Sequence, residues 1–577
     1  MFDLVIRDAE IFDGTGSPSW RGDVALAAGR IAALGRLGPC SSREELRADG
    51  RVVCPGFIDI HSHADVTLYR ADHAEVLAPL VLQGITTVVA GNCGMGLAPL
   101  GTQHRQAVLD YIEVFTQRPL GPELNWSDSA GLFDRLEHQG VLLNVALLTP
   151  HALLRLGTCG SVARPATSGE LADMAHALEV SLEAGTIGLS LGLQYFPGSQ
   201  SDQHELVELA RIVARHGGMV SCHLRDYSVA LERAIDELAG VAAASDVTVQ
   251  ISHLHALPEV GPLFPALRKG LRLLSALHRR WPFEPPLRFP LASALERVRH
   301  LRQRGLRLGA DVMPTTTGFT HLLAMFPPWA LEGPAHQVLA NLADPEVRAR
   351  LRRSIHHGRP RWPHREGDDW SLNLIRSMGW EGIRIMAVAT ERNRELLGLS
   401  LAELGERRTC DPLDAACELL LEENGQVLIF MAMTEPEDPM LDQAFLPGLL
   451  DLEASVSTDT ILLGQGIPSP LFHNCYPRYL GRFVRDQGRL PLSAALRKIT
   501  AHPASQAGLQ KRGQLRKGWP ADLLVLDPAD FEDRSSFAHP AVSPAGLALV
   551  CINGTPVVRD GTLVPGVLAG TVLRRGT

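Results

Sequence analysis

The sequence is poor in cysteine and has no surplus of positive charge, and each lack excludes a class of protein. Its nine cysteines are scattered, odd in number and never spaced as C-x-x-C. A disulfide framework is therefore not expected, and the reducing cytoplasm is the natural compartment. The formal net charge of -9 argues against a nucleic-acid partner, because a phosphate backbone requires a basic surface.

Long apolar runs are also missing. No stretch approaches the length that crosses a membrane, and the first residues place acids within an apolar alternation instead of a basic segment before an apolar block. We therefore expect no membrane association and no signal peptide. Hydrophobic residues make up 45% of the chain and charged residues 21%, which is typical of globular proteins. A length of 577 residues suits one barrel with insertions.

Short apolar segments alternate with segments of helical periodicity through most of the chain. This alternation predicts an α/β fold with a (β/α)8 TIM-like barrel, whose functional side chains gather at the C-terminal ends of the strands. The expected strands are 57–60, 85–90, 142–148, 187–191, 219–222, 247–251, 306–310 and 454–457. The residues just past their ends include His61, His63, Cys93, His151, Gln194, His223, His253, Asp311 and Asp459.

The two ends of the chain carry short strand-like segments with turn signals between them. Such strands cannot bury their faces alone, so we expect the ends to pair into one small β-sandwich beside the barrel. A long stretch between the seventh and eighth expected strands predicts a lid or specificity subdomain. The expected division is 1–54 for the first part of the sandwich, 55–313 for barrel strands one to seven, 314–453 for the insertion, 454–510 for strand eight and its helices, and 511–577 for the rest of the sandwich.

His61 and His63 follow the first expected strand. Residues two apart in an extended chain point the same way, so both imidazoles can reach one point in space while Ser62 faces away. This is a metal-ligand geometry. On its own it is weak, because an isolated H-x-H in a chain with 22 histidines is more often a pair of unrelated loop residues.

Residues with metal-ligand chemistry follow further strands. After H-x-H come a histidine at position 223 in S-C-H-L-R-D, one at 253 in I-S-H-L-H, and an aspartate at 459 in V-S-T-D-T. This order resembles the ligand order of the amidohydrolase superfamily. The local text is similar to the N-acyl-D-amino-acid deacylase (D-aminoacylase) branch, in PGFIDIHSH at 55–63, QGITTVVAGNCGMGLAPL at 83–100, AGTIGLSLGLQYFPG at 184–198, FPPWA at 326–330 and GQLRKGWPADLLVLD at 513–527.

The resemblance implies a zinc enzyme. Cys93 in G-N-C-G resembles the thiolate ligand that stands where other amidohydrolases place a carboxylated lysine or a glutamate. With His223 and His253 it would hold the tighter zinc. The chemistry agrees, because neutral imidazoles, a thiolate and a carboxylate suit Zn2+, and the open coordination position holds a water whose pKa falls toward about 7.

Asp459 has two interpretations. It can cap the N-terminus of the following helix, or it can accept a proton from a metal-bound water and hand it to the departing amine. Because the other ligand positions are filled, we favour catalysis, and we expect Asp459 with His61 and His63 to outline a second, weaker metal position. The prediction is zinc-dependent cleavage of the amide bond of N-acyl amino acids, with a small-molecule substrate whose D configuration is implied by the resemblance alone.

Three further residues are candidate substrate ligands. His151 in L-T-P-H could line the pocket, and a structural histidine is an equal alternative. Arg225 in H-L-R-D could contact substrate or pair with Asp226, and a buried structural ion pair is equally compatible with the sequence. His255 stands where the branch has the lysine of H-K-C-A-G.

The text around the expected pocket departs from the branch. H-L-H-A-L at 253–257 and D-V-M-P-T at 311–315 replace H-K-C-A-G and D-Q-Y-P-Y, whose basic and phenolic side chains help relatives to hold the substrate carboxylate. T-D-T at 458–460 replaces S-D-G. Cyclic amide hydrolysis, deamination, and a non-catalytic homologue that kept the fold are therefore alternatives. The sequence determines neither the oligomeric state nor the occupancy of the second metal position.

Overall fold

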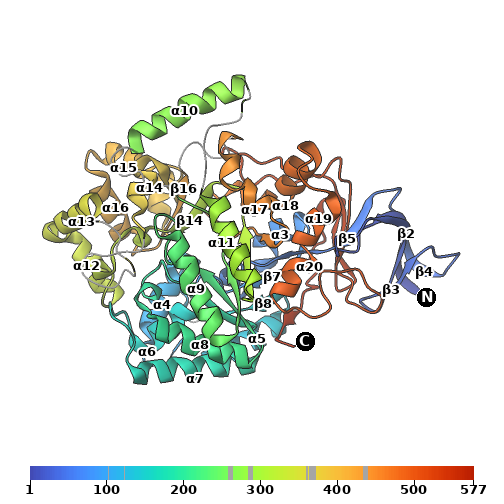
Figure 1. Ribbon diagram of the computed structural model, residues 1–577, viewed down its shortest axis with the longest axis horizontal. Helices are drawn as coiled ribbons and strands as arrows, with labels where there is room; N and C mark the ends of the chain where they lie inside the picture. The colour runs from blue at the N-terminus through green and yellow to red at the C-terminus, as the bar shows by residue number, and fades with distance from the viewer. Residues whose placement is uncertain are drawn as a thin grey trace.

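The computed structural model describes residues 1–101, 103–121, 124–257, 264–281, 283, 290–358, 362, 372–432 and 439–576. It is an α/β structure with parallel sheets at its centre, a sheet built from both chain ends on one side, and a helical region on the other (Figure 1). Within the described residues, no helix is both long and apolar enough to cross a membrane.

The central parallel strands form where apolar segments were predicted, to within two residues at each end. One sheet has the order β22-β8-β7-β6 and the other the order β17-β13-β12-β11-β10-β9. The strands are β6 (Phe57–Asp59), β7 (Ile85–Ala90), β8 (Asn144–Leu147), β9 (Thr149–Pro150), β10 (Gly188–Gly192), β11 (Met219–His223), β12 (Thr248–Ile251), β13 (Leu308–Val312), β17 (Ala454–Val456) and β22 (Val572–Leu573).

The two parallel sheets meet at both of their ends. The third predicted strand divides into β8 and β9 and so contributes to both sheets. Between them, the Ile187 amide donates a hydrogen bond to the Leu147 carbonyl at 2.9 Å. On the other side an isolated parallel bridge joins Ser62 to Thr460, just past β6 and β17. The C-terminal strand β22, which the sequence pattern did not predict, pairs in parallel with β8.

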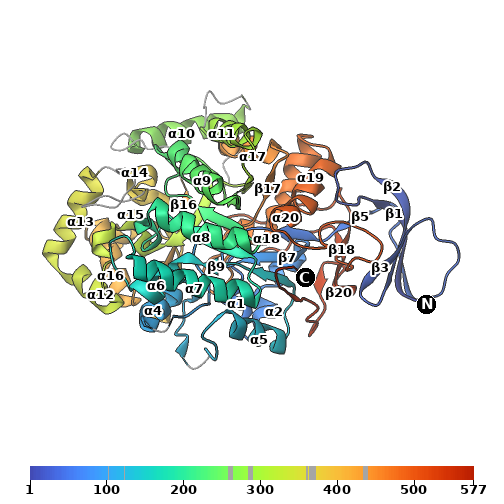
Figure 2. The same ribbon diagram turned by 60° about the horizontal axis from the view of Figure 1, so that its bottom comes forward.

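Helices follow the strands and cover the sheets (Figure 2). Helix α7 shows why they begin and end where they do: Thr167 and Glu170 form a capping box at its start, and Gly185 follows its last residue. The longer helices here are α4 (Arg105–Thr116), α5 (Ser129–Gln139), α6 (His151–Cys159), α7 (Ser168–Ala184), α8 (Gln203–Arg215), α9 (Leu231–Ser245), α11 (Leu291–Gln303), α18 (Pro470–Arg478), α19 (Leu492–Lys498) and α20 (Ala501–Gln506).

A nine-stranded sheet unites the two chain ends. Strand β5 pairs with β18 in antiparallel register, with Val53 opposite Val525, and the sheet buries its own apolar cluster, which includes Ile6 and Leu549. Its strands are β1 (Phe2–Ile11), β2 (Trp20–Ala27), β3 (Arg30–Gly35), β4 (Ser42–Arg47), β5 (Val52–Pro55), β18 (Leu523–Leu526), β19 (Leu547–Ile552), β20 (Thr555–Arg559) and β21 (Thr562–Leu563).

The stretch between β13 and β17 contains a small antiparallel sheet of order β14-β16-β15. It buries an apolar cluster separate from the central one. Helix α10 precedes this region in the chain, and its Leu271 joins the second cluster. The elements are α10 (Phe264–Arg280), β14 (Thr317–His321), α12 (Ala335–Ala343), α13 (Pro345–His357), α14 (Leu374–Met378), β15 (Ile383–Val388), α15 (Leu401–Arg408), α16 (Pro412–Glu422), β16 (Val427–Ala432) and α17 (Leu446–Leu450).

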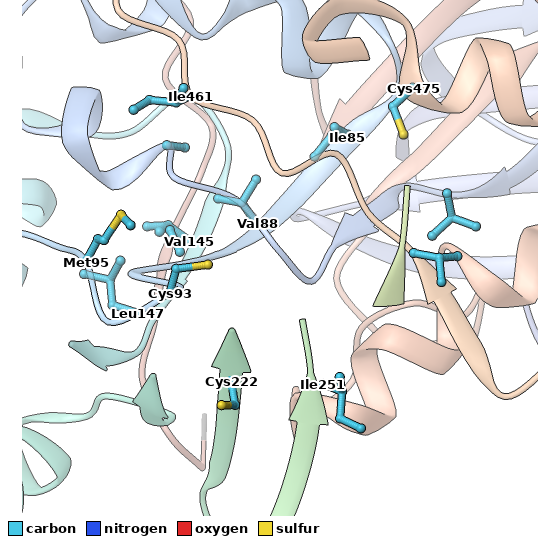
Figure 3. Close-up of a cluster of buried hydrophobic side chains, with 14 of the residues drawn as sticks. Ile85, Val88, Cys93, Met95, Val145, Leu147, Cys222, Ile251, Ile461 and Cys475 are labelled. Carbon is cyan, nitrogen blue, oxygen red and sulfur yellow. The ribbon is translucent and has the colours of Figure 1, made fainter. Parts of the chain in front are cut away.

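The apolar core between the parallel strands extends to Cys93, one of the candidate metal ligands. Val88, Val145 and Ile251 pack in this core together with Cys222 and Cys93 (Figure 3). Cys222 is fully buried, as expected for the face of β11 opposite His223. Cys93 lies at the boundary of the core, where its thiol meets histidines.

Candidate metal centre

Six residues that the sequence singled out converge past the ends of the parallel strands. Each is at most 7% exposed, and each comes from a different turn except for the H-x-H pair. We call this group the ligand cluster. Its members are His61 and His63 after β6, Cys93 after β7, His223 at the end of β11, His253 after β12 and Asp459 after β17.

The Cys93 thiol is the centre of one half of the ligand cluster. Its Sγ lies 3.3 Å from His61 Nε2, 3.7 Å from His223 Nδ1 and 3.5 Å from His253 Nε2. The rings of His223 and His253 are also close to each other, with 3.0 Å between His223 Nδ1 and His253 Nε2. One ion among these atoms could contact a sulfur and several nitrogens, which are the donors that zinc prefers.

The Asp459 carboxylate is the centre of the other half. Its Oδ1 lies 3.4 Å from His61 Nε2 and 3.3 Å from His63 Nε2. Two groups have ligand atoms within 4.8 Å of one another: His61 with Cys93 and His253, and His61 with His63 and Asp459. His61 therefore belongs to both halves, a shared position that the sequence did not indicate.

A hydrogen bond prepares His223 to act as a ligand. Its Nε2 lies 2.9 Å from the Gln194 Oε1, and because the amide oxygen can only accept, Nε2 carries the hydrogen. The lone pair of Nδ1 then points toward Cys93 and His253. Gln194, noted in the sequence only for following the fourth strand, thus fixes the tautomer of His223.

The backbone of the ligand cluster is strained. Cys93, His253 and Asp459 adopt φ values of 55°, 31° and 50°, a left-handed region that residues other than glycine rarely enter. Asp311 braces one of these turns, because its carboxylate accepts from the His253 amide at 2.8 Å and from Ser457 Oγ at 2.7 Å. Strain held by surrounding contacts is a mark of functional sites.

Burial shapes the protonation of the ligand cluster. Burial and neighbouring imidazoles lower the pKa of His61, His223 and His253 well below the ordinary value, so these rings are neutral and can ligate. Burial, with the charge of Asp459, raises the pKa of the Cys93 thiol. A thiolate at this position therefore needs a nearby cation, which a metal ion supplies.

A cavity opens over the ligand cluster. His63, Cys93, His223, His253 and Asp459 form part of its lining. We call its remaining lining the walls, and they come from the turns after the strands and from the region between β13 and β17. Apolar members include Met95, Phe115, Met313, Phe319, Met431 and Phe445.

Two of the three candidate substrate ligands are not among the residues that line this cavity, and their contacts fit the structural alternative given for each. His151 is fully buried and its Nε2 donates to Glu205 Oε1 at 2.7 Å. Arg225, also fully buried, donates to Glu237 and, at 2.6 Å, to the Ser199 carbonyl. Glu205 lies 54 residues from His151 and Glu237 lies 12 residues from Arg225, both outside the local motifs, so local text could not identify these ion pairs.

His255 does line the cavity. Its ring stacks on Tyr227 with centroids 4.2 Å apart and planes 7° apart, and Nδ1 donates to the His253 carbonyl at 2.6 Å. Tyr227 also supports the loop through its hydroxyl, which donates to the Ser252 carbonyl at 3.0 Å. Neither Tyr227 nor Tyr195, whose ring lies 4.5 Å from that of His223, was named as a site residue from the sequence, although Tyr195 lies within the AGTIGLSLGLQYFPG motif at 184–198.

Comparisons with known proteins agree with this arrangement. A model described as the amidohydrolase family matches residues 451–558. The chain is 29% identical to a D-aminoacylase of Alcaligenes xylosoxydans xylosoxydans over 574 residues, which cover 100% of this chain and 98% of the relative. It is 30% identical to an N-acyl-D-glutamate deacylase of the same organism over 573 residues, covering 99% and 96%.

Solved structures of similar chains contain metals. An N-acyl-D-glutamate deacylase from Bordetella bronchiseptica, in complex with zinc and a phosphonate mimic of the tetrahedral intermediate, superposes with a TM-score of 0.75 at 27% identity over 99% of both chains. A D-aminoacylase described for its binuclear metal centre, with one-metal activation and second-metal attenuation, superposes with a TM-score of 0.75 at 26% identity over 100% of both chains.

Proposed function

Because this chain belongs to the amidohydrolase family, in its N-acyl-D-amino-acid deacylase branch, we propose that it is a zinc-dependent hydrolase of the C–N bond in N-acyl amino acids or similar N-acyl compounds. The observation that carries the proposal is the convergence of the Cys93 thiol with three buried imidazoles beside Asp459. Five separate turns supply these groups, and a merely structural role would not require them to meet.

The ligand cluster fits a zinc ion on its own chemistry. Cys93, His223 and His253 would hold the tighter ion, and His61, His63 and Asp459 would outline a second position. The Nε2 atoms of His61 and His253 face the Cys93 thiol at 3.3 and 3.5 Å, so one ion could contact all three donors. A bound zinc ion supplies Lewis acidity, which polarises an acyl carbonyl and makes water a stronger acid.

Asp459 is the residue that we assign to proton transfer. In the overall reaction water adds to the acyl carbon, the C–N bond breaks, and the amine leaves with a proton. The Asp459 carboxylate accepts the proton from the attacking water and passes it to the departing nitrogen. His63 Nε2, 3.3 Å from Asp459 Oδ1, orients that carboxylate toward the cavity.

We also propose a finer architecture for the scaffold. The eight parallel strand positions close into a (β/α)8 barrel, which the Ser62–Thr460 bridge supports. The sheet of both chain ends folds into a β-sandwich, and the domain limits are 1–54 with 511–577, 55–313, 314–453 as a lid, and 454–510. We assign the protein to the cytoplasm because all nine cysteines are free.

The experiment that tests the function measures metal and activity in one sample. Purified protein is analysed for zinc and incubated with N-acyl-D- and N-acyl-L-amino acids and with cyclic amides, and free amine, free acid and ammonia are quantified. We expect bound zinc, and release of free amine together with the acyl acid that a chelator abolishes. Ammonia release or ring opening alone would assign another amidohydrolase reaction, and a protein without zinc or activity would contradict the proposal.

A further inference from the structure

The walls of the cavity hold little that could bind an anion. No lysine or arginine of the described residues lines the cavity, and Asp459 is the one lining residue with an acidic side chain. Thioethers and aromatic rings line it, among them Met313, Phe319, Met431 and Phe445. A carboxylate enclosed by these walls would lose its hydration without gaining a lysine or arginine partner from the described lining, which is unfavourable.

The walls also include threonine hydroxyl groups, which are neutral. Thr317 is 6% exposed, lines the cavity, and its Oγ1 has no hydrogen-bond partner among the described residues. A buried hydroxyl without a partner destabilises the protein unless a ligand or water meets it. It suits an amide or another neutral polar group, since a hydroxyl can both donate and accept.

His255 does not supply the missing cationic side chain. Its ring is fixed between the Tyr227 ring, at 4.2 Å, and the His253 carbonyl, at 2.6 Å from Nδ1. It is therefore held against the edge of the cavity as part of the loop. It cannot extend into the cavity toward a substrate as a lysine side chain would.

We propose that the preferred substrates carry no carboxylate beside the scissile amide. They are N-acyl amines or N-acyl amino-acid amides with apolar groups on both sides of the C–N bond. This inference rests on the proposed function and names its substrate class. Hydrolysis adds water across the C–N bond and releases a carboxylic acid and an amine, and the new carboxylate forms only in the product.

A matched set of substrates tests the inference in the zinc-loaded wild-type protein. N-acyl-D-phenylalanine, its primary carboxamide and N-acyl-phenethylamine share one ring and differ at the carboxylate, and each is tested with an acetyl and an octanoyl group. Release of the acyl acid is measured, so hydrolysis of the primary carboxamide is not counted. We expect kcat/KM for the two neutral compounds to exceed that for the carboxylate by about tenfold or more.

A pair of lysine variants tests whether the lack of a cation in the walls causes the preference for neutral substrates. Met313→Lys adds a cation to the wall and is expected to shift the ratio of kcat/KM toward the carboxylate by about tenfold. Leu273→Lys adds the same charge on α10, where the side chain is 64% exposed, and should leave the ratio unchanged. The wild-type comparison stands alone if the Met313 variant does not fold.

The outcomes separate this inference from the proposed function. Faster hydrolysis of the carboxylate than of both neutral compounds would overturn the inference and leave the function in place. Absence of acyl acid from every compound, with zinc bound, would overturn the function and the inference together. An equal shift of the ratio in both lysine variants would also overturn the inference, because the cation in the wall would then have no specific effect.

Discussion

Two clusters of buried histidines and carboxylates lie near the ends of the same parallel strands, and they differ in how their charges are balanced. In the Glu205 cluster, which consists of His151, Arg155 and Glu205, both carboxylate oxygens of Glu205 meet a nitrogen donor. In the ligand cluster, imidazoles and a thiol surround one carboxylate, and no arginine or lysine of the described residues lines the space above them.

The difference separates a structural cluster from a functional one. In the Glu205 cluster each carboxylate oxygen already has a nitrogen donor, so the acid needs no metal ion to balance its charge. In the ligand cluster, neutral imidazoles and a thiol face one another. A metal ion there would be bound by all of these donors at once. Burial is nearly the same in both, so the identity of the partners carries the distinction.

The largest expected effect is on catalysis in the ligand cluster. Asp459→Asn keeps the shape of the side chain and removes the proton acceptor, so we expect kcat/KM to fall by about 10²- to 10⁴-fold. Zinc content of the purified variant is the control, and it should stay near the wild-type level at the tighter position. Full activity in this variant would remove Asp459 from the mechanism.

The next effect is on stability in the Glu205 cluster. Glu205→Gln leaves the Arg155 charge buried without its partner, so we expect a loss of about 3 kcal/mol in the free energy of unfolding, with bound zinc and kcat retained by the folded fraction. The matched control is Glu208→Gln on the same helix, whose exposed pair with Arg211 contributes about 0.5 kcal/mol or less. Urea unfolding followed by circular dichroism measures both.

The pH dependence of the free energy of unfolding gives a second test of the Glu205 ion pairs. Burial raises the pKa of Glu205, but the hydrogen bond and charge of His151 and the charge of Arg155 outweigh it and lower the pKa from 4.5 to about 2. The unfolded chain therefore takes up this proton before the folded protein, and stability is lost as the pH falls from about 4.5 to about 2. The difference between wild type and Glu205→Gln should shrink over that interval, and a constant difference would contradict this account.

The smallest effect concerns the contact that shapes the Cys93 turn. A Cβ added at Gly192 would lie 2.1 Å from the Cys93 carbonyl oxygen, so Gly192→Ala must displace that turn. We expect a loss of about 1 to 3 kcal/mol in stability and a lower zinc content. Gly169→Ala, where an added Cβ meets nothing within 4 Å, should change neither, and wild-type zinc in Gly192→Ala would show that the turn adapts.

The pattern of the sequence predicted the α/β class and the positions of the central strands, and the members of the ligand cluster were proposed from it. Apolar segments such as 85–90 must be buried wherever they occur, so their pattern predicts strands locally. The ligand residues were proposed because side chains that can bind zinc follow those strands in an order that resembles that of the amidohydrolase superfamily, and the resemblance assigned Cys93 as the thiolate ligand. His61 and Cys93 could be proposed before any contact was known.

Only the tertiary structure decided which candidates share a partner. His151 follows a strand as His61 does, yet its ring meets Glu205, 54 residues further along the chain, whereas His61 meets Cys93 at 32 residues' distance and Asp459. The sequence pattern also did not show which residues form the apolar walls of the cavity, since Phe319 and Met431 come from the region between β13 and β17. Contacts between residues distant in sequence depend on packing, which local pattern does not encode.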